Sequence, residues 1–137
     1  MLELGDTFIL PKSSGAIEHL WILITCPKNN CSVGVNLTKL RPNADKTVVL
    51  QPGEHPFIKV ESIILYSDAR YIELIKLSEM LGKGSFNFTC STHSRCTPPF
   101  LTKVQRGLLV SPFTPNAIKD YCRNVWAGDA ALNARIE

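Results

Sequence analysis

The sequence predicts a mainly β domain whose principal helices lie in its C-terminal part. The 137 residues suit a single ordinary domain that buries one core. Up to about residue 75, short runs of β-branched and aromatic residues alternate with turn residues, whereas the fourfold apolar spacing of helices begins only near residue 98. We therefore expect one domain over residues 1–137, with β structure over about 4–75, a helical part over about 98–127 and a tail over 128–137.

The composition is that of a globular protein. Its hydrophobic fraction of 45% and charged fraction of 20% exclude a highly charged disordered chain. The strongest apolar run, residues 20–25, is far shorter than the roughly 18 residues that a membrane-spanning helix needs. Because the N-terminus also lacks the basic start of a secretory signal, we expect a cytoplasmic protein with no membrane partner. The net charge of +3 is compatible with an RNA partner but does not establish one.

The first strands are predicted to form a hairpin. A short β-like run at residues 6–10 ends at Pro11, and a polar loop follows. Residues 20–25 are apolar on both faces, which indicates a central strand buried on both sides. Residues 27–30 have the composition of a turn, and the alternating pattern of residues 32–37 predicts the antiparallel partner strand.

The middle of the chain continues the β pattern. We expect further short strands at residues 47–50 and 62–66, separated by a proline-containing turn at 51–56. Residues 71–81 mix strand and helix signals, so they are predicted as a strand followed by a helical turn that closes at a glycine.

Two amphipathic helices are predicted in the last third of the chain. The first begins at Pro98 and places Phe100, Val104 and Leu108 along one face. The second has Thr114 as its N-cap, followed by a proline at the first helical position. Its apolar stripe consists of Ile118, Tyr121, Cys122, Val125 and Trp126.

The five cysteines stand at unrelated spacings, which argues against a disulfide framework. We expect free thiols and predict no cofactor. The alternative is a zinc-stabilised structural protein, because Cys26 lies near Cys31 while Cys90, His93 and Cys96 form a C-x2-H-x2-C run. Neither half has the C-x2-C knuckle that makes zinc sites recognisable, so thiols in the core or in loops are the favoured interpretation.

Residues 4–75 carry a resemblance to a known family. Gly5 and Asp6 precede the first strand, and a flexible loop, a hydrophobic strand, a hairpin and a strand ending in a hydroxyl residue follow. This order resembles the PemK/MazF superfamily of toxin ribonucleases, with residues 19–25 similar to its strand two and residues 33–38 similar to its strand three. Residues 45–66 also resemble small bacterial proteins associated with the same barrel.

The resemblance implies a small SH3-like barrel that forms a homodimer, cleaves single-stranded RNA without a metal and is inhibited by an antitoxin protein. One position departs from the family pattern. Members place an arginine just before strand two, where a fixed cation can stabilise the pentavalent phosphate of the transition state. His19 stands there in this sequence. Histidine can move a proton near neutral pH, but it is a less permanent cation than arginine.

His19 and Thr38 are the leading catalytic candidates. If the two hairpin strands pair, an imidazole and a hydroxyl able to hold a phosphate oxygen lie together; the alternative is that His19 ends a loop and Thr38 caps a strand. His55 is the second candidate acid or base, since metal-free phosphodiester cleavage uses one group to take a proton and another to give one. A histidine in such a turn more commonly hydrogen-bonds the backbone, and we favour that role for His55.

Basic and aromatic residues near strand three suggest an RNA track. Lys39, Arg41 and Lys46 can attract phosphates independently of sequence, although a solvated loop is the commoner explanation for such residues. Tyr66, at the end of a strand, is a better candidate for stacking on an unpaired base than Trp21, which lies within an apolar run and is expected in the core.

The sequence therefore predicts a PemK/MazF-like toxin-type protein and an endoribonuclease activity at His19 and Thr38. Two alternatives stay open. The same barrel can serve as a non-catalytic module that binds nucleic acid or protein, or the chain can be a zinc-stabilised structural protein that uses Cys26, Cys31, Cys90 and Cys96.

Overall fold

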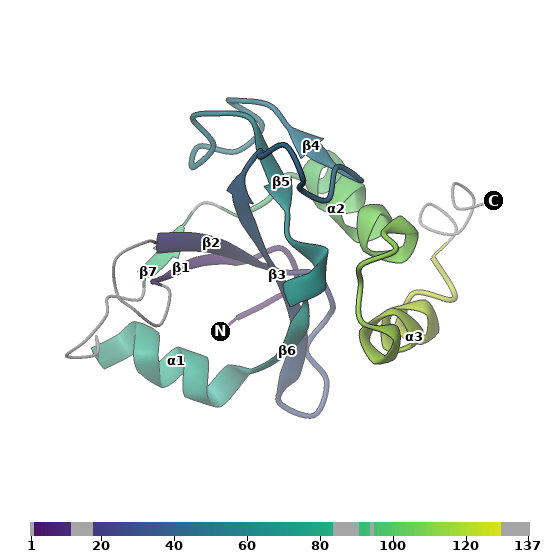
Figure 1. Ribbon diagram of the computed structural model, residues 1–137. Helices are drawn as coiled ribbons and strands as arrows, with labels where there is room; N and C mark the ends of the chain where they lie inside the picture. Colours follow the sequence, from purple (N-terminus) through teal and green to yellow (C-terminus); the bar gives the residue numbers. More distant parts are fainter. Residues whose placement is uncertain (1, 12–17, 84–90, 94, 130–137) are drawn as a thin grey trace.

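The fold is a strongly curved antiparallel sheet with helices packed on both of its faces (Figure 1). The computed structural model describes residues 2–11, 18–83, 91–93 and 95–129. The prediction of a mainly β chain with C-terminal helices is confirmed. The strands are β1 (Thr7–Pro11), β2 (Glu18–Leu23), β3 (Cys31–Lys39), β4 (Val49–Leu50), β5 (Ser62–Ile64), β6 (Arg70–Glu73) and β7 (Ser91–His93), and the helices are η1 (Tyr66–Asp68), α1 (Leu74–Lys83), α2 (Pro98–Val110) and α3 (Asn116–Val125).

Strand β3 is the centre of the sheet. The strand order is β4-β5-β3-β2-β1-β7, and β6 pairs with the first half of β3 while β5 pairs with its second half. β5 and β6 therefore follow one another along the same edge of β3, joined by the short helix η1. This arrangement places the η1 turn directly beside the middle of β3, where Leu65 N donates a hydrogen bond to Asn36 O at 2.9 Å.

The predicted β2–β3 hairpin is confirmed. Lys28 and Cys31 exchange two backbone hydrogen bonds of 2.9 and 3.0 Å across a two-residue turn. The central residues Asn29 and Asn30 have φ angles of 52° and 65°, as a hairpin turn compatible with strand twist requires. Asparagine tolerates this left-handed conformation better than other non-glycine residues, which explains why the turn forms here.

The two faces of the sheet bury separate apolar clusters. On one face, β2 and β3 contribute residues such as Ile22 and Val35 to the larger cluster, together with Val104 and Leu108 of α2. On the opposite face, the smaller cluster consists of Leu2, Phe8, Trp21, Leu23, Leu74 and Leu77, so α1 covers this side. Successive residues of a strand point to opposite faces, and the successive residues 20–23 of β2 are all buried. The prediction of a strand buried on both sides is therefore confirmed.

The sheet does not close into an SH3-like barrel. Its outer strands in the order are β4 and β7, and no pairing joins them within the described residues. The physical reason is the helix α2, whose Phe100, Val104 and Leu108 enter the larger cluster and fill the concave side of the sheet. In a small closed barrel, side chains of the strands themselves fill that space.

Several boundaries differ from the sequence-based expectation. The segment predicted as a strand and a helical turn is β6 followed by the full helix α1. β1 runs through Pro11, where the sheet tolerates proline because β7 pairs only with residues 7–9. Thr114 does not cap α3: its hydroxyl donates to Leu108 O at 2.7 Å, and Pro115 occupies the N-cap position. None of the described helices is long and apolar enough to span a membrane.

Candidate functional site

The predicted pair His19 and Thr38 lies on the α1 side of the sheet. The β2–β3 ladder pairs Trp21 with Asn36, and the same register carried two residues further sets His19 opposite Thr38. Residues directly opposite in an antiparallel pair share a face of the sheet. A hydrogen bond of 3.0 Å between His19 Nδ1 and Leu37 O ties the imidazole to this end of β3.

The contacts of His19 determine its tautomer. A carbonyl oxygen can only accept, so Nδ1–H of His19 is the donor to Leu37 O, and in the neutral ring Nε2 carries the free lone pair. This Nε2 atom is buried and has no hydrogen-bond partner among the residues that the structure describes, and the whole residue is only 9% exposed. The ring is therefore poised chemically to accept a proton, yet it is enclosed in this conformation.

A second group on the same face was not predicted from the sequence. Arg70 on β6 pairs with Gly34 of β3, and its guanidinium carbon lies 5.3 Å from the centroid of the Trp21 ring. The same guanidinium forms an ion pair with Asp68. The other carboxylate oxygen of Asp68 accepts a hydrogen bond of 2.6 Å from the side-chain amide of Asn36. We call Asn36, Asp68 and Arg70 the arginine cluster.

The backbone around η1 builds this cluster. Asp68 N donates to Leu65 O at 3.0 Å, which tightens the turn between β5 and β6 and carries the carboxylate back towards Asn36. Gly34 leaves the room that the cluster needs. A Cβ atom at that position would lie 2.9 Å from Ile72 and 3.4 Å from Trp21, so glycine lets these two side chains approach β3 closely.

The exposure of these residues decides what they can contact. The Arg70 side chain is 57% exposed and that of Asp68 is 32% exposed, so both reach solvent. Trp21 is only 8% exposed because its ring stacks on Phe8 at 6.4 Å and lies beneath Arg70. Trp21 is thus a core residue, and the guanidinium held over it is a solvent-accessible cation on this face.

His55 lies elsewhere. It is 2% exposed, its Nδ1 accepts a hydrogen bond of 3.1 Å from Phe57 N, and its ring lies 6.0 Å from that of Phe100 in α2. These contacts belong to the α2 side of the sheet, opposite the face that carries His19. The structure therefore does not bring the two histidines together, and it gives His55 the backbone contact expected of a turn histidine.

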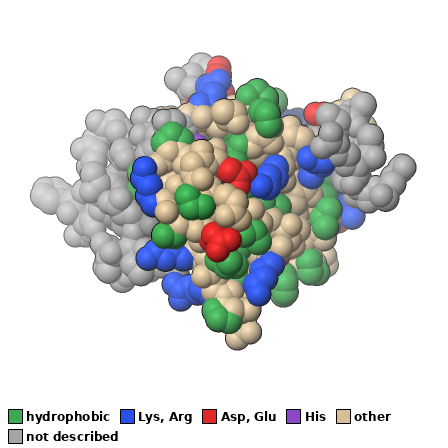
Figure 2. Space-filling model, turned by 90° about the horizontal axis from the view of Figure 1, so that it is seen from above, with side chains coloured by type: hydrophobic (Ala, Val, Ile, Leu, Met, Phe, Trp, Pro, Cys, Tyr) green, Lys and Arg blue, Asp and Glu red, His purple; other side chains and the backbone are tan. Residues whose placement is uncertain are grey.

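The predicted RNA track is only partly accessible. Lys39, Arg41 and Lys46 are exposed, and none of them forms an ion pair with another described residue. Figure 2 shows one face of the molecule, where basic side chains surround acidic and apolar ones instead of forming a continuous stripe.

Tyr66 is fully buried, and its hydroxyl donates to Val104 O at 2.7 Å. Burial, together with the charge of Asp45, raises the pKa of Tyr66 well above its usual value. Its ring offers no face to a base.

The cysteines do not form a metal site within the described part of the chain. Cys26 is exposed and Cys31 is partly buried, whereas Cys96 and Cys122 are buried. Burial raises the pKa of Cys122 to about 12, and burial with the charge of Asp6 does the same for Cys96. No group of three or more candidate ligands occurs among the residues that the structure describes. Cys90 and the His93 side chain lie outside them.

Comparison with known proteins finds no family model that matches the sequence and no curated protein with significant similarity. The chemistry of the site is therefore inferred from its own geometry.

Proposed function

We propose that the protein is a PemK/MazF-like, toxin-type endoribonuclease that acts on single-stranded RNA without a metal, and that its sheet is an opened form of the SH3-like barrel. The observation that carries this proposal is a solvent-accessible guanidinium, Arg70, on the same sheet face as His19 and Thr38. A homodimer and an inhibitory antitoxin protein belong to the same proposal.

Arg70 supplies the charge that the sequence pattern lacked before β2. A permanent cation held on β6 can stabilise the additional negative charge of a pentavalent phosphate as well as one held at the start of β2, provided that it faces the same side. The guanidinium carbon lies 5.3 Å from the centroid of the Trp21 ring, and the ion pair with Asp68 holds the guanidinium in this place. An RNA phosphate then competes with Asp68 for the exposed edge of the guanidinium.

The other roles follow from the donors and acceptors present. Once the imidazole has moved out of its enclosed position, His19 Nε2 takes the proton of the ribose 2′-hydroxyl, whose oxygen attacks the adjacent phosphorus. The bond from phosphorus to the 5′-oxygen breaks, and the imidazolium returns its proton to that leaving oxygen. Thr38 donates a hydrogen bond to a phosphate oxygen. The products are a 2′,3′-cyclic phosphate and a 5′-hydroxyl, and no water or metal is consumed in this step.

Cleavage of single-stranded RNA in EDTA tests the proposal. We expect the purified protein to yield fragments with cyclic phosphate ends, His19→Ala to yield none, and Arg70→Ala to lower the rate by at least 100-fold, since one charge-stabilising donor contributes about 10²–10³ in rate. Arg123→Ala is the matched control, because Arg123 is 58% exposed and lies on α3. Intact RNA with the unaltered protein at micromolar concentration would contradict the activity.

A non-catalytic RNA-binding module is the second candidate, and the enclosure of His19 favours it. An Nε2 atom that solvent does not reach cannot receive a proton from a bound ribose in this conformation. If the module interpretation holds, RNA stays intact but binds, and Arg70→Ala weakens the binding while Arg123→Ala does not. The same set of variants therefore separates the two functions.

A further inference from the structure

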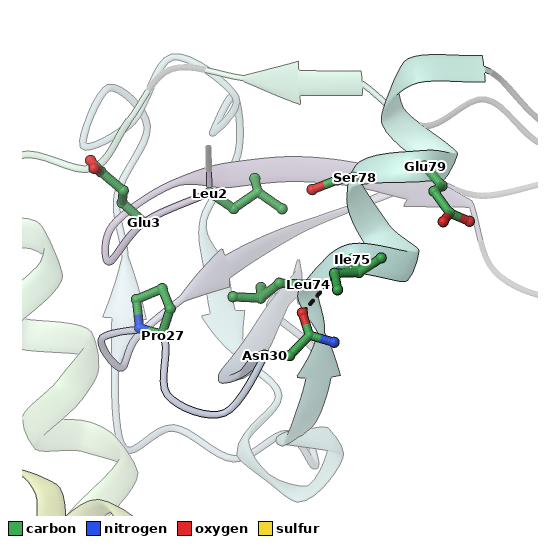
Figure 3. Close-up of a pocket in the computed structure, with 8 residues that line it drawn as sticks. All are labelled: Leu2, Glu3, Pro27, Asn30, Leu74, Ile75, Ser78 and Glu79. Atoms are coloured by element: carbon green, nitrogen blue, oxygen red, sulfur yellow. Dashed lines mark hydrogen bonds between the residues drawn. The ribbon is translucent and has the colours of Figure 1, made fainter.

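A second surface feature lies on the α1 side of the sheet, and its lining includes no member of the arginine cluster. Figure 3 shows a hollow between the start of α1, the β2–β3 turn and the N-terminal segment. Its volume is about 670 Å³, which is within the usual range of ligand-binding pockets. We call it the α1 hollow. Its apolar lining is Leu2, Pro27, Leu74 and Ile75, and its acidic lining is Glu3 and Glu79.

The floor of the α1 hollow is part of the smaller core cluster. Leu2 and Leu74 are each 9% exposed and belong to that cluster, whereas Ile75 is 60% exposed and stands at the side of the hollow. An aliphatic side chain placed here would extend an existing apolar core and cover Ile75. The geometry thus favours an occupant with at least one aliphatic group.

Two backbone donors at the start of α1 are not available to an anionic occupant. The N–H groups of the first two residues of α1 both donate to Asn30. Its backbone oxygen accepts from Leu74 N at 2.8 Å, and its side-chain oxygen accepts from Ile75 N at 3.0 Å. Helix N-termini attract anions through such N–H groups, and those of Leu74 and Ile75 are engaged here.

The charges around the α1 hollow favour a cationic occupant. Arg95 is shared between Glu3 and Asp6 at 2.9 and 2.8 Å, so these three groups keep one net negative charge. Glu79 adds a second carboxylate at the other side of the hollow (Figure 3). No lysine or arginine lines the α1 hollow within the described residues.

We propose that the α1 hollow binds a short segment of a partner protein in which aliphatic side chains are flanked by Lys or Arg. The aliphatic groups pack on Leu2, Leu74 and Ile75, and the basic groups face Glu3 and Glu79. The α1 hollow lies on the same side of the sheet as His19, Thr38 and Arg70, but none of these residues lines it, and binding there does not depend on any activity of the proposed RNA site.

Two synthetic tetrapeptides test this inference with the full chain. The probes are acetyl-Lys-Leu-Leu-Lys-amide and acetyl-Glu-Leu-Leu-Glu-amide, titrated while backbone amide shifts are followed by NMR. We expect the Lys peptide to change the amide chemical shifts of Asn30, Ile75 and Ser78 until the site is saturated. The Glu peptide should bind at least fivefold more weakly. Raising the salt concentration should weaken the binding of the Lys peptide, because salt screens the attraction between exposed charges.

Two exposed positions provide the variants. Ile75→Ser should weaken the Lys peptide about tenfold, since covering an isoleucine contributes on the order of one to two factors of ten in affinity. Glu79→Lys should weaken it at least fivefold. Val110→Ser is the matched control, because Val110 is 56% exposed but lies on α2. Circular dichroism melting confirms that each variant is folded. The inference is overturned if the Lys peptide causes no saturable shifts, if the Glu peptide binds equally well, or if Ile75→Ser leaves the affinity unchanged.

Discussion

Gly107, in the last turn of α2, should resist replacement by alanine even though alanine is the better helix former. A Cβ atom there would lie 2.8 Å from Tyr66 Cζ and closer still to Tyr66 Oη and Val48 Cγ2. Both neighbours are buried, and the Tyr66 hydroxyl is fixed by its hydrogen bond to Val104 O. α2 approaches the sheet this closely only because residue 107 has no side chain.

The magnitude follows from three contributions. Alanine gains about 1 kcal/mol of helix propensity over glycine. Overpacking of a filled core costs about 1–3 kcal/mol, and displacing Tyr66 from Val104 O costs a further ~1–3 kcal/mol because a buried hydroxyl loses its partner. We therefore expect Gly107→Ala to lower the free energy of unfolding by roughly 3 kcal/mol, which lowers Tm by on the order of 10 °C in a domain of this size.

Urea unfolding followed by tryptophan fluorescence measures this change. Gly128→Ala is the matched control, because nothing lies within 4 Å of a Cβ atom at that position. In a Tyr66→Phe background, Gly107→Ala should cost less, since the hydroxyl that lies nearest to the new methyl group is gone, and the coupling should exceed about 0.5 kcal/mol. A neutral or stabilising Gly107→Ala would refute the close packing of α2 against Tyr66.

Three further substitutions or treatments test the loops and thiols. Burial alone would raise the pKa of Glu54, but hydrogen bonds from a backbone N–H and from Lys103 outweigh burial and lower the pKa. The stability that Glu54 contributes is therefore present above the ordinary carboxyl pKa of 4.5 and is lost as the pH falls below it. Glu54→Gln should flatten this fall in Tm between about pH 5 and 3, and an unchanged pH profile of Tm would contradict the assignment. At pH 8, a thiol reagent should modify exposed Cys26 within minutes but leave buried Cys96 unmodified until the protein unfolds, and equal rates would contradict the burial of Cys96. Asn30→Ala should lower the free energy of unfolding in urea by about 1–3 kcal/mol, because it removes a helix cap and places alanine at a φ of 65°. Asn30→Gly should lower it less, because glycine adopts this φ without strain. The reverse order would show that the turn does not need the left-handed conformation.

The elements that the sequence predicted well are those with local causes. The Asn29-Asn30 turn and the apolar strand before it specify the hairpin within a few residues, and the proline start of α2 is equally local. The open sheet could not be predicted in this way. Whether strand side chains or a helix fill the concave side depends on how α2 docks, which is set by contacts such as Gly107 against Tyr66 between distant parts of the chain.

The arginine cluster was missed for a related reason. An aspartate and an arginine two residues apart are common on surfaces, and nothing local shows that Arg70 faces Gly34 on β3. The isolated Gly34 within an alternating strand was the available signal, because such a glycine marks a close approach of other groups across the sheet. Reading that signal would still have required the register between β3 and β6.

Substitutions of Arg70 and of His19, the two halves of the proposed site, should affect RNA binding and RNA cleavage differently. Arg70 is exposed and His19 is enclosed, so under the proposed function the binding of a phosphate depends on Arg70 and the proton transfer depends on His19. Arg70→Ala should therefore weaken RNA binding and reduce the slope of log affinity against log salt by about one, because one phosphate contact is lost. His19→Ala should leave affinity within about twofold and abolish cleavage. Filter binding over a range of salt concentrations, beside the EDTA cleavage assay, measures both. If His19→Ala instead lowers affinity as much as Arg70→Ala while both remain folded, the imidazole contacts RNA directly and the enclosed conformation is not the one that binds.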